Sequence, residues 1–239
     1  MGKKVIFENL GRIRYKEAWD YQEKLFREVI RDKLEQRSEK KQYLLFCEHE
    51  HVFTIGKSGN QNNLLIAKNL CQSKHIDLHA IDRGGDITYH GPGQLVVYPI
   101  IDLEDFQIGI KRYIAMLEDV VIETLKVFGI AAEKDEKAMG VWLDPGHPAK
   151  ARKICAIGVR ASRFVTMHGL ALNVNTDLSY FNYINPCGFT DRGVTSMQKE
   201  LGHEVDFQAV SKTMKDTFAA LFGISYSEEA VGQNQMMVQ

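Results

Sequence analysis

Apolar side chains recur at helical spacing in three stretches of the chain, which cover residues 15–36, 111–128 and 207–222. An apolar residue at every third or fourth position forms one buried stripe along a helix, with polar residues on the opposite face. Gly129 and Gly223 directly follow the second and third stretches, and glycine commonly ends a helix. The pattern therefore predicts three amphipathic helices.

Shorter apolar runs between these helices have the length of β-strands, and the clearest is Leu95-Val96-Val97-Tyr98-Pro99-Ile100-Ile101. The predicted strands cover residues 4–8, 42–47, 52–55, 76–81, 94–102, 141–143, 153–162 and 169–175. Helices and strands do not alternate regularly, so we expect an α+β fold rather than repeated βαβ units. No linker or repeat divides the chain. We expect a single domain over residues 1–239, with a frayed polar tail at 227–239.

Composition narrows the class of protein. The 239 residues are 44% hydrophobic and 26% charged, which suits one globular domain with a substantial core. Lys plus Arg number 30 and Asp plus Glu number 31, so no positive field favours nucleic acid. We expect no signal peptide, because the first eight residues have no long apolar region followed by a small-residue cleavage site. No apolar run approaches the ~20 residues of a membrane helix. We expect a cytoplasmic protein with free thiols and no nucleic-acid or membrane partner.

A glycine-rich segment follows the predicted strand at 76–81. It reads Arg83-Gly84-Gly85-Asp86-Ile87-Thr88-Tyr89-His90-Gly91-Pro92-Gly93-Gln94. Glycine permits positive φ and a close approach of the backbone to a ligand. The segment has neither the Gly-Lys-Ser/Thr of a phosphate loop nor the glycine spacing of a dinucleotide-binding fingerprint. Two interpretations stay open: a tight turn between strands, and a ligand-binding loop flanked by Arg83 and His90.

Lys153 begins an otherwise apolar strand, Lys153-Ile154-Cys155-Ala156-Ile157-Gly158-Val159. A buried ammonium group is costly unless it has a partner or a chemical role, although a lysine near a strand end can also extend to solvent. Strand alternation predicts that Lys153, Cys155 and Ile157 share one face. Cys155 is therefore one candidate nucleophile that the Lys153 amine could activate.

Cys187 lies in the turn Asn185-Pro186-Cys187-Gly188, which can present a thiol to a substrate. An inert packed thiol is the alternative interpretation. A cysteine nucleophile served by an amine base is typical of acyl transfer, and we prefer Cys187 and Lys153 as the pair. Either a neutral Lys153 amine deprotonates the thiol, or a thiolate–ammonium pair forms, and the sequence leaves both possibilities open.

The histidines show no metal-binding pattern. A zinc site needs three or four converging ligands, and the sequence has no His-Glu-x-x-His helix. We therefore expect no metal. His49, His90 and His168 are interpreted as hydrogen-bonding groups near a site or within the core.

Four motifs follow one another along the chain. They are residues 83–94, Lys153-Ile154-Cys155-Ala156-Ile157-Gly158, His168-Gly169-Leu170-Ala171-Leu172-Asn173-Val174, and Asn185-Pro186-Cys187-Gly188. In this order they resemble the lipoyl(octanoyl) transferase family, as does the stretch Glu48-His49-Glu50-His51-Val52-Phe53-Thr54-Ile55-Gly56. Members of that family move an octanoyl group from acyl carrier protein to a lysine of a lipoyl domain. The resemblance extends from about residue 43 to 200, which is most of the chain.

The resemblance implies a biotin/lipoate ligase-like fold, a mixed sheet with helices packed against it. It also implies an ATP-independent, ping-pong octanoyltransferase of protein lipoylation and lipoate biosynthesis, with no cofactor. Cys187 would carry the acyl group as a thioester, and Lys153 would act as the base that lowers the pKa of the thiol. The implied acyl site consists of Arg83, Gly84, Gly85, Asp86, Ile87, Thr88, Tyr89, His90, Ala156, Ile157, Gly158, Gly169, Leu170 and Ala171.

The resemblance further implies protein partners. Acyl carrier protein would be the octanoyl donor, and lipoyl domains of 2-oxoacid dehydrogenases and the glycine cleavage H protein would be the acceptors. Because acyl carrier proteins are typically acidic, a basic rim is expected, and Lys150, Arg152, Arg160 and Arg163 are the candidates for it. An ordinary solvated surface at these positions is the alternative interpretation. A larger residue at Gly85 or Gly169 is expected to impair acyl loading while leaving the fold intact.

Two other classes of protein stay open. A lipoate or biotin ligase of the same fold would activate a free acid with ATP and would need no nucleophilic cysteine. A carrier-protein binding module would bind its partner without forming an acyl intermediate. The chain also departs from the family at Asp86, where a neutral or basic residue is often found, and in an insert at residues 144–150.

Overall fold

The computed structural model describes residues 3–37, 40–147, 149–185 and 192–227. Within them, a large sheet has the strand order β12-β1-β2-β6-β10-β9-β8-β7, with β11 beside β9. These strands are β1 (Lys3–Ile13), β2 (Tyr43–His49), β6 (Gln94–Ile100), β7 (Glu133–Lys134), β8 (Val141–Leu143), β9 (Arg152–Ser162), β10 (Val165–Asn173), β11 (Gly193–Val194) and β12 (Ile224–Ser227). Strand β1 pairs in parallel with β2 and β12, whereas β2–β6, β6–β10 and β10–β9 are antiparallel. The expected α+β class with a mixed sheet is confirmed.

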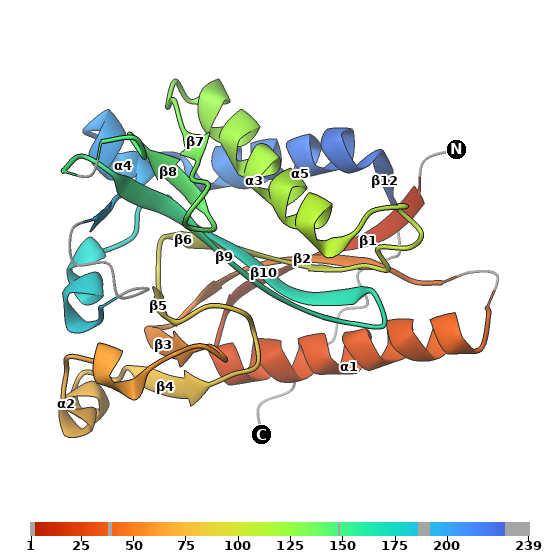
Figure 1. Ribbon diagram of the computed structural model, residues 1–239, viewed down its shortest axis with the longest axis horizontal. Coiled ribbons are helices and arrows are strands. Elements are labelled where there is room, and N and C mark those ends of the chain that lie inside the picture. Colours follow the sequence, from red (N-terminus) through yellow and green to blue (C-terminus); the bar gives the residue numbers. More distant parts are fainter. Residues whose placement is uncertain (1–2, 38–39, 148, 186–191, 228–239) are drawn as a thin grey trace.

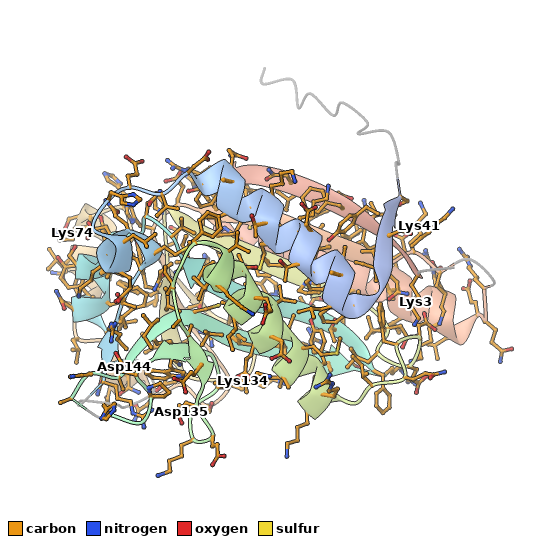
Figure 2. All side chains as sticks on the ribbon, turned by 90° about the horizontal axis from the view of Figure 1, so that it is seen from above. Lys3, Lys41, Lys74, Lys134, Asp135 and Asp144 are labelled. Carbon is orange, nitrogen blue, oxygen red and sulfur yellow. The ribbon has the colours of Figure 1, made fainter. Side chains whose placement is uncertain are left out.

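Helices cover both faces of this sheet (Figure 1). Among the described residues, the α-helices are α1 (Tyr15–Leu34), α2 (Lys68–Ser73), α3 (Ile110–Val127), α4 (Met197–Leu201) and α5 (Phe207–Phe222), and the 3-10 segments are η1 (Gln61–Asn63) and η2 (Leu178–Tyr183). Helix α1 packs on one face, while α3 and α5 lie side by side over the other (Figure 2). Strand β6 shows the alternation that this layering requires, since Leu95 and Val97 face α3 and α5 whereas Val96 and Tyr98 face α1.

The helix ends follow from local sequence. The Asp206 carboxylate accepts hydrogen bonds from the backbone N–H groups of Gln208 and Ala209 at 2.9 and 3.1 Å, so it caps the start of α5. Gly223 ends the same helix with φ of +62°, a conformation that costs glycine little. The three predicted helices are confirmed, with ends that differ by two residues or fewer.

A small second sheet has the order β4-β3-β5 and contains β3 (Val52–Ile55), β4 (Asp77–Ala80) and β5 (Ile87–His90). It packs against the start of α1, where Tyr15, Val52 and Ile81 form a buried cluster. Strand β5 lies inside the glycine-rich segment, so this segment is half turn and half strand. The two sheets and the start of α1 therefore meet at one place in the fold.

The predicted strands at 52–55 and 141–143 coincide with β3 and β8, and the other predicted strands overlap observed ones. Strands β5, β7, β11 and β12 were not predicted. β7 and β11 are two residues long, which is too short for an alternating pattern. β12 reaches Ser227, which the sequence placed in a frayed tail, because it pairs in parallel with β1 from the other end of the chain.

Candidate active site

A cavity of about 260 Å³ lies where the large sheet, the small sheet and α1 meet. Its lining includes Met139, which is 44% exposed, and also Tyr15 and Tyr98, which are 2% and 3% exposed. The cavity therefore runs from an open rim to a buried inner end. A narrow, largely apolar cavity with a few polar groups is the usual form of a small-molecule site.

Most residues expected at an acyl site line this cavity. They are Arg83, Gly85, Asp86, Ile87, Thr88, His90, Ala156, Ile157, Gly158, Gly169, Leu170 and Ala171. Gly84 and Tyr89 are not part of the lining. Tyr89 is fully buried on the other side of β5, where its ring packs on Phe53 and Tyr180, because successive side chains of a strand point to opposite faces. The Gly84 N–H is used in a backbone hydrogen bond to the Val159 carbonyl at 3.0 Å.

Cross-strand neighbours of β6, β10 and β9 form the sheet wall of the cavity. Gln94 pairs with Asn173, Ala171 pairs with both Val96 and Ala156, and Gly169 pairs with Gly158. The second of these rows is small and apolar, and the third has no side chains. Small residues in register leave a trough above the sheet, which we call the acyl trough: Val96, Ala156, Gly158, Gly169 and Ala171.

A β-bulge places Lys153 at this trough. Val141 of β8 pairs with Cys155, and Trp142, the next residue, pairs with Lys153, so Ile154 is an extra residue in β9. The prediction that Lys153 and Cys155 share a face is therefore wrong. Lys153 lines the cavity, whereas Ile154 and Cys155 are both buried in the core beneath α3.

Cys155 is not placed to act as a nucleophile. Its side chain is 0% exposed and does not line the cavity. Burial raises the pKa of its thiol far above the ordinary value, and the nearby charge of Lys153 offsets only part of this rise. A thiol without a thiolate form is inert in acyl transfer.

Lys153 lies between the cavity and two neighbouring strands. Its Nζ is 4.7 Å from the centre of the Trp142 ring, and the Trp142 indole N–H donates to the Ala138 carbonyl at 2.8 Å. On the other side Val194 of β11 pairs with Lys153 and also lines the cavity. Cys187 lies outside the described residues, in the sequence between Asn185 and this strand.

Two buried histidines beside the cavity are neutral. The His90 Nδ1–H donates to the Gln94 side-chain oxygen at 2.7 Å, and burial lowers the pKa of His90 well below the ordinary value. The His49 Nδ1–H donates to the Ile13 carbonyl at 2.9 Å, and its Nε2 accepts from the Tyr98 hydroxyl at 2.6 Å. Burial lowers the pKa of His49 to about 4. Both rings therefore act as uncharged hydrogen-bonding groups near pH 7.

His168 lies at the inner end of the cavity with φ of +59°, a strained conformation for a side chain of this size. Its Nε2–H donates to the Asp82 carboxylate at 2.9 Å, and Asp82 also pairs with Arg160 at 2.5 Å. The backbone N–H of His168 donates to the side-chain oxygen of Gln22 at 3.0 Å. The bond from His168 and the charge of Arg160 lower the pKa of Asp82, while burial lowers the pKa of His168. This arrangement closes the cavity with a neutral imidazole.

Arg83 is 8% exposed and holds the glycine-rich segment against β3. Its Nη2 donates to the Thr54 carbonyl at 2.8 Å and to the Thr54 hydroxyl at 2.9 Å, and its Nη1 donates to the Gly84 carbonyl at 3.0 Å. Gly85 has φ of +89°, so a larger residue there would be strained. The geometry of this turn thus depends on the Arg83 guanidinium group and on Gly85.

The expected basic rim is not a continuous patch. Arg152 pairs with Glu200 at 2.6 Å and with Asp144 at 2.5 Å, and Arg160 pairs with Glu23 and Asp82. Arg163 follows the far end of β9 from Arg152, about 35 Å away at ~3.3 Å per strand residue. The prediction of one basic docking surface from these residues is wrong, because closeness in sequence along a strand is not closeness in space.

Several lining residues were not predicted. They include Tyr15, Val96, Tyr98, Lys137, Met139, Phe181 and Val194. Tyr15 occupies an apolar position of an amphipathic helix, and Val96 and Tyr98 lie in a continuous apolar strand, so each looks like an ordinary core residue. In the part of the chain that the structure describes, no helix is both long and apolar enough to cross a membrane. Nor do the described residues contain a group of three or more His, Cys, Asp or Glu that could hold a metal ion.

Residues 14–219 match the family model described as the lipoyl protein ligase A/B catalytic domain. The chain belongs to this family. A relative from Parabacteroides distasonis named octanoyltransferase is 51% identical over 216 residues, 90% of this chain and 97% of the relative. One from Porphyromonas gingivalis, with the same name, is 54% identical over 217 residues, 91% of this chain. The chain spans only 44% of that second relative, which is therefore a much longer protein.

Several solved structures share the fold of this chain. A bipartite lipoate protein ligase from Thermoplasma acidophilum has a TM-score of 0.70 at 17% identity, over 97% of this chain and 88% of that one. Lipoate-protein ligase A bound with ATP has a TM-score of 0.70 at 16% identity, over 98% and 90%. Biotin protein ligase from Aquifex aeolicus, at 13% identity over 92% and 71%, has a TM-score of 0.52. The expected biotin/lipoate ligase-like fold is confirmed.

Proposed function

We propose that this member of the lipoyl protein ligase A/B family is an octanoyltransferase. It would move an octanoyl group from octanoyl-acyl carrier protein to the lysine of a lipoyl domain. The observation that carries the proposal is the acyl trough, which leads from the buried inner end of the cavity toward Lys153. Relatives that are 51% identical and named octanoyltransferase support it.

The trough suits an apolar chain. Burying a methylene contributes about 0.8 kcal/mol, so a medium-length acyl chain is held mainly by the apolar surface it covers. Val96, Ala156 and Ala171 supply that surface without filling the space. Gln94 and Asn173, joined by a 2.8 Å hydrogen bond, lie in the row of the sheet on the Lys153 side of the trough. The thioester carbonyl belongs at this polar end.

Lys153 and Cys187 would form the reacting pair. Val194, seven residues after Cys187 in the sequence, pairs with Lys153, so the chain beyond the thiol returns to the lysine. The face of the Trp142 ring, 4.7 Å from Lys153 Nζ, attracts an ammonium group. This contact favours a thiolate–ammonium pair over a neutral amine and thiol. A thiolate is the form of cysteine that attacks a thioester.

The transfer takes two steps. In the first, the Cys187 thiolate attacks the thioester carbonyl carbon, the bond from that carbon to the carrier sulfur breaks, and the departing thiolate takes a proton from Lys153. In the second, the amine of the acceptor lysine attacks the octanoyl-cysteine, the carbon–sulfur bond breaks, and neutral Lys153 takes the proton released by the amine. An amide forms and the thiolate–ammonium pair is restored. A thioester is already activated, so no ATP enters this cycle.

The proposed partners follow from the chemistry of the two steps. Acyl carrier protein presents the thioester, and lipoyl domains of 2-oxoacid dehydrogenases and the glycine cleavage H protein present the lysine. We place the reaction in the cytoplasm, where thiols stay reduced. Isolated lipoyl domain and H protein should each gain one octanoyl mass when incubated with the enzyme and octanoyl-acyl carrier protein, and acceptors that gain none are not substrates.

The decisive experiment incubates the full-length protein with octanoyl-acyl carrier protein in the absence of ATP, followed by intact and peptide mass measurement. We expect one octanoyl adduct on the peptide that contains Cys187, lost when a lipoyl domain is added. Cys187→Ser should form no thioester. An adduct on Cys155 would keep the reaction but move the nucleophile into the core, against its burial.

A lipoate ligase is the second candidate, since the same fold binds ATP in the solved lipoate-protein ligase A. That activity would appear only when ATP and a free acid replace the acyl thioester. A binding module would associate with acyl carrier protein, form no adduct, and keep its affinity in Cys187→Ser. Either result would refute the transferase proposal.

A further inference from the structure

Asp86 links the glycine-rich segment to the loop at residues 56–65. It lines the cavity, and its Oδ2 accepts a hydrogen bond from the side-chain Nδ2 of Asn63 at 2.5 Å. Its Oδ1 accepts from the backbone N–H groups of Ile87 at 2.7 Å and Asn60 at 3.2 Å. Three donors thus converge on one side chain. A carboxylate accepts on both oxygens, whereas an amide offers only one accepting atom, so an acid suits this position.

The backbone of the same loop follows the glycine-rich segment closely. The N–H groups of Gly56 and Lys57 donate to the carbonyls of Asp86 and Arg83 at 3.2 and 3.0 Å. A Cβ on Gly59 would lie only 3.2 Å from Asp86 Oδ1. The start of the loop is therefore held by main-chain contacts, and the Asp86 side chain holds its far end at Asn63.

The far end of the loop contacts residues 183–185, which precede Cys187. The Asn63 carbonyl accepts from the Asn185 N–H at 2.8 Å, and the Leu65 N–H donates to the Tyr183 carbonyl at 2.9 Å. Between them Leu64 and Ile184 form an antiparallel bridge. Asn185 precedes Cys187 by two residues. One residue, Asn63, thus contacts Asp86 with its side chain and Asn185 with its backbone.

We infer that Asp86 is a positioning residue for the Cys187 thiol, acting through Asn63 and the segment at residues 183–185. The inference rests on the proposed function, in which Cys187 is the nucleophile. Displacing a nucleophile by about 1 Å from its productive position can cost ~10²-fold in rate. Because Asn63 does not line the cavity, loss of its bond to Asp86 should lower kcat and leave KM for the acyl donor nearly unchanged.

Asn63→Asp provides the strongest test, because it places a second carboxylate at hydrogen-bonding distance from Asp86. We expect kcat to fall roughly tenfold to a hundredfold, with KM within twofold. The double variant Asp86→Asn/Asn63→Asp exchanges donor and acceptor, keeps the wild-type net charge and should recover most of the lost rate. Asp86→Asn alone should be milder, since the Asn63 amide can rotate to accept from it. Asn62→Asp is the matched control, because it adds the same charge at an exposed neighbour without a side-chain bond to Asp86.

Amide hydrogen exchange supplies a readout that does not depend on catalysis. Exchange at Asn185 and Leu65 should accelerate in Asn63→Asp and return toward the wild-type rate in the double variant. The inference is overturned if Asn63→Asp acts like Asn62→Asp, if Asp86→Asn fails to rescue it, or if KM rises while kcat holds. A wild-type protein that forms no octanoyl adduct would instead refute the proposed function, and the exchange data would still show whether Asp86 anchors residues 183–185.

Discussion

The two walls of the cavity are built by different physical means. On the sheet wall, β6, β9 and β10 pair their backbone groups with one another, and side-chain size alone shapes the acyl trough. On the opposite wall, the glycine-rich segment and the 56–65 loop depend on side chains that bond to backbone, chiefly Arg83 and Asp86. The shape of the sheet wall is therefore set by the volumes of its side chains, and the shape of the opposite wall by hydrogen bonds from side chains to backbone. Substitutions should therefore affect packing and chain-length preference on one wall, and placement of the reacting groups on the other.

Gly169 gives the largest expected effect, and it corrects the expectation that a larger residue there leaves the fold intact. A Cβ at this position would lie 2.1 Å from the Val97 carbonyl oxygen and 2.8 Å from the Pro99 ring, inside the sheet rather than in the cavity. Backbone must move, so Gly169→Ala should lower the free energy of unfolding by at least about 3 kcal/mol, measured by urea denaturation. Gly146→Ala, in an open turn with nothing within 4 Å, is the control. Equal midpoints for the two variants would contradict this.

Acidification should destabilise the protein through its buried neutral histidines. The pKa of His49 is about 4 in the folded protein and 6.5 ordinarily, so the unfolded chain binds the extra proton between these values. The free energy of unfolding therefore falls as pH drops from about 6.5 to 4, by up to about 3 kcal/mol for this group. The full contribution of His49 to the free energy of unfolding is therefore present above about pH 6.5.

Urea denaturation at a series of pH values tests this. His49→Gln should flatten the pH dependence of the unfolding free energy across that window, whatever its effect at pH 7. The exposed His203→Gln is the control. A wild-type slope in His49→Gln would assign the acid sensitivity to other groups.

Narrowing the acyl trough gives the next effect. Ala156→Leu adds carbon atoms inside the cavity and should exclude about two methylenes of an octanoyl chain, worth ~1.6 kcal/mol or roughly tenfold in kcat/KM. Hexanoyl transfer should fall much less. Ala161→Leu, on the same strand but exposed, should change neither. Equal losses with octanoyl and hexanoyl donors would mean that the acyl chain does not occupy this trough.

The paired arginines give the smallest effect. Arg152 forms two bonds of 2.6 Å with the Glu200 carboxylate, and this pair holds α4 beside β9. Arg152→Met should lower the free energy of unfolding by about 1 kcal/mol, because a two-bond arginine–carboxylate pair is stronger than an ordinary surface ion pair. The free energy of unfolding of Arg163→Met should stay within ~0.5 kcal/mol of that of the wild type.

The same arginine tests the docking surface, and Arg163→Glu should leave KM for acyl carrier protein within twofold. A large rise would restore a docking role to that end of β9.

Local sequence was enough for elements whose geometry depends on near neighbours. The apolar stripe of α5, its Asp206 cap and its Gly223 stop all lie within one stretch of chain, and the helix was predicted with its observed ends. Strand β5 was not predicted, because Ile87–His90 forms a strand only by pairing with β3, more than thirty residues earlier. Residue patterns predict local conformation, but they do not predict which distant segments pair with each other.

The candidate site shows the same division. Lys153 and most of the glycine-rich segment were found by their unusual residue types, and the structure places them at one cavity. Tyr15, Val96 and Tyr98 were missed, since apolar or aromatic residues in a helix or strand carry no mark of a ligand site. On the sequence alone Cys155 is a second candidate nucleophile, and the bulge at Ile154 places its side chain in the core. A β-bulge depends on how a strand pairs with its partner strand, and the alternation of residues along one strand does not reveal that pairing.

The sequence by itself determined the three long helices, the α+β class and the family, and it supplied the candidate site residues. It could do so because helical periodicity, capping residues and glycine positions encode short-range geometry directly. Only the tertiary structure decided which side of β9 faces the cavity and that Arg152 and Arg160 are neutralised by carboxylates. It also decided that Asp86 is linked through Asn63 to Asn185. These outcomes depend on contacts between residues far apart in the chain, and such contacts exist only after the two sheets and α1 have packed together.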